Sequence, residues 1–460
     1  MQTNFRPDQL NTAQMKESEK ILRTCVHCGF CTATCPTYLL LGDEADSPRG
    51  RIYMIKDMLE SGKAATAPVV KHVDRCLSCL SCMTTCPSGV HYMHLVDHAR
   101  AHIEATWKRP LADRMMRSLI ASVLPYRNRF RLVLKASALA RPFARMISFL
   151  PGVGPRLSAM LALAPTRIPE EGPQGPHVIP AEGERRGRVA LLGGCAQPVL
   201  DPGINAATIR LLTRNGIEVV LANEGCCGAL VHHMGREAQA HALAHQAIDA
   251  WTHEIEGDGL DAIIITASGC GTTIKDYGFM FRDDPEWAQK AQAVSSLAKD
   301  VTEYLTLMNI DWSKVHDEQA SEQAKGLVVA YHSACSMQHG QQIRDEPKSL
   351  LRKAGFVVKD VPEGHICCGS AGAYNMLQPE IASQLRDRKV GNIRKTGVQI
   401  VATGNIGCMT QIGQGFTLAG EQVSVVHTVE LLDWANGGPR PAHLQYARAA
   451  IEGTVITASV

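Results

Sequence analysis

Residues 25–36 read CVHCGFCTATCP and residues 76–87 read CLSCLSCMTTCP, so the pattern C-x-x-C-x-x-C-x-x-x-C-P occurs twice. A [4Fe-4S] cluster needs four thiolates around one small core, and in two-cluster ferredoxins the fourth cysteine of each run ligates the other cluster. The spacing therefore predicts two crossed ligand sets: Cys25, Cys28, Cys31 and Cys86 for one cluster, and Cys76, Cys79, Cys82 and Cys35 for the other. Two zinc sites or a disulfide knot are the alternatives, but four-cysteine zinc sites usually show two well-separated C-x-x-C pairs.

Helical segments flank both runs. Residues 47–62 begin with Ser47 as a candidate N-cap and Pro48 at the first helical position, and Gly62 follows as a stop signal. Residues 8–25 and 90–107 also have helical patterns. We therefore expect residues 1–107 to form an α-helical ferredoxin domain with two [4Fe-4S] clusters.

All sixteen cysteines of the chain fall into three sets, with eight at 25–86, four at 195–270 and four at 335–408. Disulfides are rare in a reducing cytosol, so ligation of metals or clusters is the default expectation. A net charge of +2 and an aromatic content of 5% argue against nucleic acid as a partner.

The first twenty residues are polar and contain no apolar signal region. No stretch approaches the roughly 18 apolar residues of a membrane-spanning helix. We therefore expect a cytoplasmic protein without a transmembrane segment.

Residues 108–187 form a predicted connector. Its first part, 108–160, carries eleven Lys/Arg and one acidic residue, Asp113, among many apolar side chains. Such a basic amphipathic segment can lie on an anionic membrane or dock a partner, and a helical connector with its basic residues in water is an equally good interpretation. Residues 165–186 are rich in Pro and Gly and are typical of a linker.

The remainder repeats at about 140 residues, which indicates a duplicated domain at 188–324 and 325–436, followed by a tail at 437–460. RVALLGGCAQP at 188 matches LVVAYHSACSMQ at 327, EGCCGALVHHMG at 224 matches HICCGSAGAYNM at 365, and DAIIITASGCGTTI at 261 matches VQIVATGNIGCMTQ at 398. The cysteines correspond pairwise: Cys195 to Cys335, Cys226 and Cys227 to Cys367 and Cys368, and Cys270 to Cys408.

Short apolar β-branched runs alternate with helical stretches in each copy, which favours βαβ units and a parallel sheet. The cysteines follow the strands, and the carboxyl ends of parallel strands gather at one edge, so four sulfurs from three loops can converge. The expected fold class is α+β multidomain: an N-terminal α-helical two-cluster ferredoxin domain followed by two tandem α/β cysteine-rich (CCG) modules.

Three interpretations of each four-cysteine set remain open: an iron-sulfur cluster, a structural zinc site, or a thiol-disulfide redox site. Burial of cysteines as small apolar residues is the alternative, and the matched repeat disfavours it.

Together these motifs resemble the heterodisulfide reductase B/C-like family, which includes iron-sulfur subunits of lactate utilisation, anaerobic glycerol-3-phosphate dehydrogenase and glycolate oxidase. The strings CVHCGFCTATCPTYLLLGDEADSPRGRIYMIK at 25, RCLSCLSCMTTCPSGV at 75, GCAQP at 194, GCCGA at 225, TASGCG at 266, CCGSAG at 367 and NIGC at 405 are most similar to the glycolate oxidase branch. The resemblance covers about residues 20–435.

The resemblance implies a heteromeric complex whose partner subunits carry FAD and oxidise glycolate to glyoxylate. This chain then relays electrons towards the quinone pool, peripherally on the cytoplasmic face of the inner membrane, and has no catalytic residue of its own. No G-x-G-x-x-G flavin fingerprint opens a βα unit, in agreement with a relay. The alternatives are the same relay for D-lactate or another 2-hydroxy acid, a thiol-disulfide oxidoreductase, and a zinc-stabilised scaffold.

One departure from the family pattern concerns the CCG modules. Family members often end a module in C-x-x-C, which supplies a fifth cysteine for a non-cubane cluster, and here Thr273 and Gln411 occupy that position. A non-cubane cluster is therefore not expected, whereas a [4Fe-4S] cluster, a zinc ion or an empty thiol site remain open. His332 and His339 lie near Cys335 in sequence and could ligate or tune a site, or could be ordinary packing or surface histidines.

Overall fold

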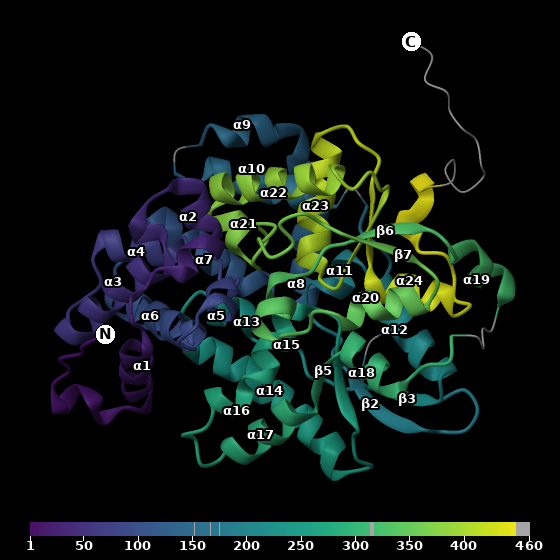
Figure 1. Ribbon diagram of the computed structural model, residues 1–460, viewed down its shortest axis with the longest axis horizontal. Coiled ribbons are helices and arrows are strands. Elements are labelled where there is room, and N and C mark those ends of the chain that lie inside the picture. The colour runs from purple at the N-terminus through teal and green to yellow at the C-terminus, as the bar shows by residue number, and fades with distance from the viewer. Residues whose placement is uncertain (151, 166, 174, 313–316, 448–460) are drawn as a thin grey trace.

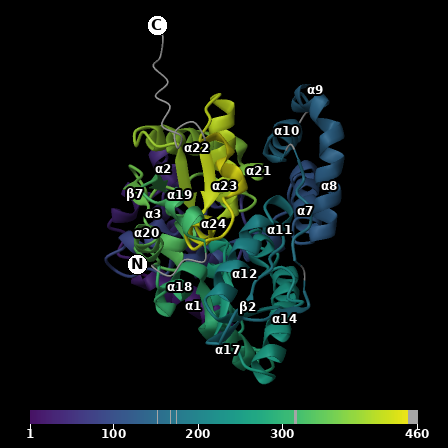
Figure 2. The same cartoon turned by 90° about the vertical axis from the view of Figure 1, so that its right-hand side faces the viewer.

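The structure is a computed structural model that describes residues 1–150, 152–165, 167–173, 175–312 and 317–447. Residues 448–460 of the predicted tail and positions 166 and 174 of the predicted linker lie outside the described residues. Figure 1 shows the N-terminal helices (purple) beside two α/β units, one teal and one green to yellow. Figure 2 shows the helices that follow residue 108 (blue) along one side of the molecule.

The N-terminal region is helical, as the sequence predicts. Its elements are η1 (Pro7–Asn11), α1 (Ala13–Thr24), η2 (Phe30–Thr34), α2 (Pro36–Leu41), η3 (Glu44–Asp46), α3 (Pro48–Ser61), α4 (Ala67–Asp74), α5 (Ser81–Thr85) and α6 (Tyr92–Thr106). The predicted boundaries of α3 are confirmed: the Ser47 hydroxyl accepts a hydrogen bond from the Gly50 N–H at 3.0 Å, and Gly62 ends the helix. Leu59 and Leu95 are fully buried in the core between α3 and α6.

The basic connector consists of short helices that pack on the rest of the protein. They are α7 (Leu111–Val123), α8 (Arg127–Ala140), η4 (Arg141–Phe143), α9 (Ala144–Ser148) and α10 (Gly154–Leu163). One face of α7 buries Met116 and Ile120 in a cluster with Val231 and Leu243. The single acidic residue, Asp113, is the ionic centre of this region, because its carboxylate pairs with Arg109, Arg117 and Arg156 at 2.8–3.2 Å.

The first CCG module contains a five-stranded sheet in the order β1-β3-β2-β4-β5. Its elements are β1 (His177–Ile179), β2 (Gly187–Leu191), α11 (Gln197–Leu200), α12 (Gly203–Arg214), β3 (Ile217–Leu221), α13 (Ala229–His232), α14 (Glu237–Glu256), β4 (Ala262–Ile265), α15 (Ser268–Lys275), α16 (Tyr277–Met280), α17 (Ala288–Leu297), β5 (Ala298–Asp300) and α18 (Val301–Met308). Strands β2 to β5 are parallel, as predicted.

Strand β1 corrects the linker prediction for part of residues 165–186. It pairs antiparallel with β3, with Val178 opposite Val220, at the edge of the sheet. Pro176 and Pro180 flank it directly. Prolines are tolerated beside an edge strand because one side of such a strand needs no ladder hydrogen bonds. The sequence around this three-residue strand therefore has the composition of a linker, and composition alone did not predict the strand.

The second CCG module contains a parallel four-stranded sheet in the order β7-β6-β8-β9. Its elements are β6 (Val328–Tyr331), the π-helical turn η5 (Ser336–Gly340), α20 (Glu346–Lys353), β7 (Val357–Asp360), α21 (Tyr374–Leu377), α22 (Pro379–Arg394), β8 (Ile400–Thr403), α23 (Ile406–Leu418), β9 (Ser424–His427) and α24 (Thr428–Ala435). Two elements outside the predicted range 325–436 also pack on it: α19 (Glu318–Ala324) on α24 and η6 (Ala442–Ala447) on β9.

The two modules share one hydrophobic core. Leu212 and Val301 of the first module belong to the same buried cluster as Leu351 and Leu432 of the second, where α12 packs on α24 and α18 packs on α20. The modules are therefore held in a fixed relation to each other. Among the described residues, no helix combines the length and the apolar character needed to cross a membrane.

Candidate metal centres

The two N-terminal cysteine runs adopt the same loop conformation. The residues two and four positions after the first cysteine have positive φ in both runs, namely His27 and Gly29 in the first and Ser78 and Leu80 in the second. Each loop then enters a short helix, η2 or α5, that contains the third cysteine and ends at the fourth. The sequence repeat is therefore also a structural repeat.

The first cysteine set surrounds a cavity of about 30 Å³. The sulfur-bearing residues that line it are Cys25, Cys28, Cys31, Cys82 and Cys86. The fourth cysteine of the second run thus lies with the first three of the first run. Cys28 is exposed, whereas burial raises the pKa of Cys31 to about 11. Buried thiols of this kind need a bound cation to remain thiolates.

The second cysteine set is buried throughout. Burial raises the pKa of Cys82 well above its usual range, and the neighbouring sulfurs of Cys79, Cys76 and Cys35 raise it further. Cys35, from the first run, therefore lies among the first three cysteines of the second run. This is the placement that crossed ligation requires.

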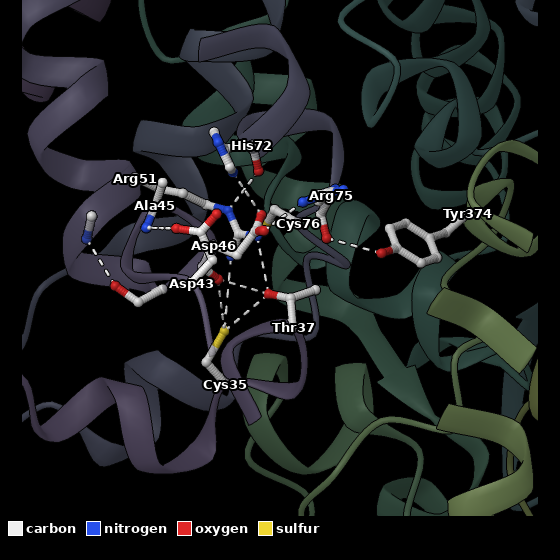
Figure 3. A network of polar contacts seen from close by, with 12 residues as sticks. Cys35, Thr37, Asp43, Ala45, Asp46, Arg51, His72, Arg75, Cys76 and Tyr374 are labelled. Atoms are coloured by element: carbon white, nitrogen blue, oxygen red, sulfur yellow. Dashed lines mark hydrogen bonds and ion pairs between the residues drawn. The ribbon is translucent and has the colours of Figure 1, made fainter. Parts of the chain in front are cut away.

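A buried ionic network supports the second set (Figure 3). The fully buried Asp46 carboxylate pairs with Arg51 at 3.2 Å, Arg75 at 2.7 Å and His72 at 3.0 Å. Arg51 Nη1 also donates to the Cys35 sulfur at 3.8 Å. Asp46 and His72 lie within metal-binding reach of Asp43, but two arginines already satisfy the Asp46 carboxylate, so this group is an ion-pair network.

The four cysteines of the first CCG module converge at the carboxyl ends of β2, β3 and β4, as predicted. The Cys226 sulfur donates to that of Cys195 at 3.5 Å, and the free thiols of Cys226 and Cys270 lie close enough to that of Cys227 to shift its pKa. Gly228 follows the vicinal pair with φ +80°, and a Cβ there would lie 2.8 Å from the Ala240 carbonyl oxygen. This close approach explains why glycine follows the two cysteines.

The second module repeats this geometry at the ends of β6, β7 and β8. The sulfurs of Cys335 and Cys367 are 3.6 Å apart, and those of Cys368 and Cys408 are 3.4 Å apart. Gly369 has φ +88°, and a Cβ there would lie 2.6 Å from the Ala382 carbonyl oxygen.

The residues at the missing fifth-cysteine positions are engaged elsewhere. Thr273 Oγ1 donates to the Gly269 carbonyl at 3.4 Å, and Gln411 Nε2 donates to the Ala382 carbonyl at 3.1 Å. Each module therefore offers four thiols and no side-chain donor from this position.

The two candidate histidines have different settings. His339 is fully engaged, because its Nδ1 bonds Thr84 at 2.7 Å and its Nε2 bonds the His365 carbonyl at 3.1 Å. His332 is 1% exposed, and its ring nitrogen, the Cys368 sulfur and the Cys408 sulfur all lie within 4.8 Å of one another.

The N-terminal and CCG sulfurs differ in spacing. Sulfur-to-sulfur hydrogen bonds join cysteines within each CCG module, and in the described part of the chain none joins the eight N-terminal cysteines. Sulfurs around one tetrahedral metal ion lie about 3.7 Å apart, whereas a cubane separates its thiolates over four irons. The sulfurs of the modules therefore lie closer together than those of the N-terminal sets.

The sequence did not reveal that the ferredoxin domain packs on the second module at its cysteine set. Leu77 and Cys79 belong to one buried cluster with Ile366 and Cys367, and Cys335 packs against it. After burial, the proximity of Cys335 is the main influence that raises the pKa of Cys79. The Tyr374 hydroxyl donates across this interface to the Arg75 carbonyl at 3.0 Å (Figure 3).

Family models match both parts of this arrangement. A 4Fe-4S dicluster domain matches residues 21–90, and a cysteine-rich domain (CCG) matches twice, at 189–275 and 329–413. These matches and the observed sheets confirm the predicted fold class.

Two relatives match nearly the whole chain. The glycolate oxidase iron-sulfur subunit of Escherichia coli (strain K12) is 41% identical over 436 residues, which cover 95% of this chain and 99% of that protein. The probable glycolate oxidase iron-sulfur subunit of Bacillus subtilis (strain 168) is 32% identical and covers 92% of this chain. The chain belongs to the family of glycolate oxidase iron-sulfur subunits.

Membership of the glycolate oxidase iron-sulfur subunit family confirms the resemblance seen in the motifs and places the chain among oxidoreductase subunits. The dicluster domain with its eight cysteines implies two [4Fe-4S] clusters. Lactate utilization protein A of Bacillus cereus (strain G9842) is more distant, at 29% identity over 249 residues, or 54% of this chain.

Proposed function

We propose that this chain is the electron-transfer subunit of a membrane-associated complex that oxidises glycolate to glyoxylate. FAD on partner subunits takes two electrons from the substrate with loss of two protons, and this chain passes the electrons singly towards a quinone, which becomes quinol. The proposal rests mainly on how the cysteine sets follow one another in space. The first set reaches the surface at the exposed Cys28, and the second contains the buried Cys79, which lies beside Cys335 of the second module. The names of the two long relatives support glycolate as the donor.

In this proposal the eight N-terminal cysteines hold the two clusters in the crossed sets described above. When bound, the clusters supply one-electron redox centres. The chain tunes the second set with two hydrogen-bond donors, because Arg51 Nη1 and the Tyr92 hydroxyl each lie 3.8 Å from a sulfur, that of Cys35 and that of Cys76 respectively. Hydrogen bonds to cluster sulfurs stabilise the reduced form.

The FAD-bearing partner would dock at the loop of the first set. Val26 and Phe30 flank the exposed Cys28 and are 66% and 65% exposed, and Tyr53 is 61% exposed nearby. Exposed apolar side chains around a solvent-accessible ligand loop are typical of a protein interaction surface.

The connector helices would meet the cytoplasmic face of the inner membrane, where the quinone is dissolved. Leu139, Met146 and Phe149 are more than 70% exposed, and exposed cations accompany them on the same helices, including Lys135 and Arg145. Apolar side chains mixed with cations favour binding at an anionic bilayer surface. A peripheral location follows from this contact.

We propose that the CCG cysteines also ligate metal, either as a further iron-sulfur cluster or as zinc. The ligands would be Cys195, Cys226, Cys227 and Cys270 in the first module and Cys335, Cys367, Cys368 and Cys408 in the second. Their close sulfurs and their burial support this. No residue of this chain is proposed to touch glycolate.

The experiment is optical. The tagged chain is purified anaerobically with its partner subunits, glycolate is added, and the visible absorbance of the clusters is followed. Bleaching by glycolate is expected, and a Cys28→Ser complex should bleach far less. Bleaching by D-lactate alone would indicate that D-lactate is the electron donor and would leave the electron-transfer role of this chain unchanged. Failure of both donors, with dithionite still effective and flavin present, would contradict the relay and favour a thiol-disulfide reductase.

A further inference from the structure

The two CCG modules share one framework but differ at two buried positions beside the sulfurs. Aligning Cys195 with Cys335 places Leu192 opposite His332. Aligning Ala240 with Ala382, which face the equivalent glycines, places Ala247 of α14 opposite Lys389 of α22. An imidazole and an ammonium group in the second module thus replace two apolar side chains in the first.

His332 is positioned by its backbone, and its buried ring lies beside the Cys368 sulfur. It directly follows β6, and its backbone N–H donates to the Ala402 carbonyl at 2.9 Å, which fixes the residue in the parallel ladder. Among the described residues, neither ring nitrogen has a hydrogen bond to an oxygen or nitrogen atom, and the side chain that faces the ring is the Cys368 thiol. A buried polar group without a partner is costly, so such a group indicates a ligand that completes it.

The donors around this ring are those of a transition-metal centre. The ring nitrogen and the sulfurs of Cys368 and Cys408 lie within 4.8 Å of one another. With metal–nitrogen bonds of about 2.0 Å and metal–sulfur bonds of about 2.3 Å, donors of one tetrahedral ion lie roughly 3.5–3.8 Å apart. The 3.4 Å between the Cys368 and Cys408 sulfurs is close to that separation.

Lys389 supplies buried positive charge to the same site. It is 1% exposed, its Nζ donates to the Glu363 carbonyl at 2.9 Å, and its charge acts on the thiols of Cys367, Cys368 and Cys408. A cation here compensates the negative charge of a thiolate-rich centre. In the first module the nearby cation is Arg127, which already faces the buried Glu224 carboxylate at 3.8 Å.

We propose that His332 ligates the metal centre in the second CCG module together with three of its four thiols, Cys368 and Cys408 among them, so that this module holds a mixed thiolate–imidazole centre and the first holds an all-thiolate one. The proposal rests on metal binding by the modules, as proposed above. The metal bound there is iron or zinc, because thiolate and imidazole donors suit both. Because Cys335 adjoins Cys79, this is the centre nearest to the N-terminal clusters.

The test uses the full chain, prepared anaerobically with its clusters. Metal analysis and X-ray absorption at the iron and zinc edges, with nitrogen hyperfine spectroscopy of the reduced protein, identify the element and its ligands. For zinc, the expected result is a nitrogen scatterer at about 2.0–2.1 Å. For iron, the expected result is a hyperfine coupling to an imidazole nitrogen, which the N-terminal clusters, with cysteine ligands alone, would not give.

Two variants make the assignment specific. His332→Leu installs the residue of the first module and should abolish the nitrogen signature and speed metal loss to a chelator at least about tenfold. His365→Leu removes an exposed histidine of the same module and should change neither. An unchanged nitrogen signature in His332→Leu, or no nitrogen ligand in the unmodified chain, would overturn the proposal. So would metal confined to the two N-terminal clusters.

Failure of this inference and failure of the proposed function are distinguishable. The coordination measurements need no substrate, so they stand even when glycolate does not bleach the clusters. Conversely, bleaching by glycolate through the N-terminal clusters would persist if the second module proved to have only cysteine ligands.

Discussion

Arg51 is the single side chain on which the second cysteine set most depends. It is buried, pairs with Asp46 at 3.2 Å, and donates to the Cys35 sulfur at 3.8 Å. Arg51→Ala removes one of three partners of the buried Asp46 carboxylate, which would still pair with Arg75 and His72. We expect the free energy of unfolding to fall by about 3 kcal/mol and the reduction potential of the second cluster to fall, since its sulfur loses a donor.

Denaturant unfolding followed by cluster absorbance and a potentiometric titration of the anaerobic protein check this expectation. Arg49→Ala is the matched control, because Arg49 pairs with the partly exposed Glu44 one turn away. Equal effects of the two substitutions would contradict the role assigned to Arg51.

Asp300 gives the protein a defined pH dependence. Burial raises the pKa of this N-cap carboxyl to about 6, although its oxygen accepts hydrogen bonds from the Thr302 N–H and hydroxyl. Because the folded-state pKa lies above the unfolded one, the contribution of this carboxyl to stability is fully present below about pH 4 and is lost as the pH rises through about 6. Asp300→Asn keeps the cap and should raise the free energy of unfolding by about 2 kcal/mol near neutral pH. Unfolding midpoints of both proteins should converge in acid, and a constant difference at all pH values would contradict this origin.

At the scale of elements, the exposed connector helices determine the predicted membrane contact. Replacing Leu139, Met146 and Phe149 together by serine removes apolar side chains that pack little against the protein. Since burial of each is worth about 1.5 kcal/mol or more, binding to anionic vesicles should fall at least about tenfold with glycolate oxidation unchanged in detergent. Co-sedimentation measures this, and neutral vesicles provide the control. Unchanged binding would exclude these helices as the contact.

The sequence predicted most elements and the convergence of the CCG sulfurs, because strand periodicity and the Ser47 and Gly62 signals are local. It did not predict β1, which is short and lies between prolines. Nor did it predict that Cys79 lies beside Cys335, since that contact depends on how Leu77 packs on Ile366 across two domains. Packing between domains leaves no periodic pattern in either segment.

At the scale of the whole molecule, the interface between the ferredoxin domain and the second module brings their cysteine sets together, so that electrons can pass from one set to the other. Leu77→Ala opens a cavity in this interface and should weaken it by about 2–4 kcal/mol. Hydrogen exchange should then rise in α21 and α22 but not in α1. Leu59→Ala, in the core of the ferredoxin domain, should raise exchange within α3 instead. Unchanged exchange in α21 would indicate that the interface does not depend on this contact.

The most direct test of the relay is rapid-freeze electron paramagnetic resonance of the anaerobic complex after it is mixed with glycolate. Signals of both reduced N-terminal [4Fe-4S] clusters should appear during turnover, broadened by their mutual interaction, and should disappear when a quinone analogue is added. Glycolate oxidation at full rate while both clusters stay oxidised would contradict it, because electrons would then reach the quinone without passing through this chain.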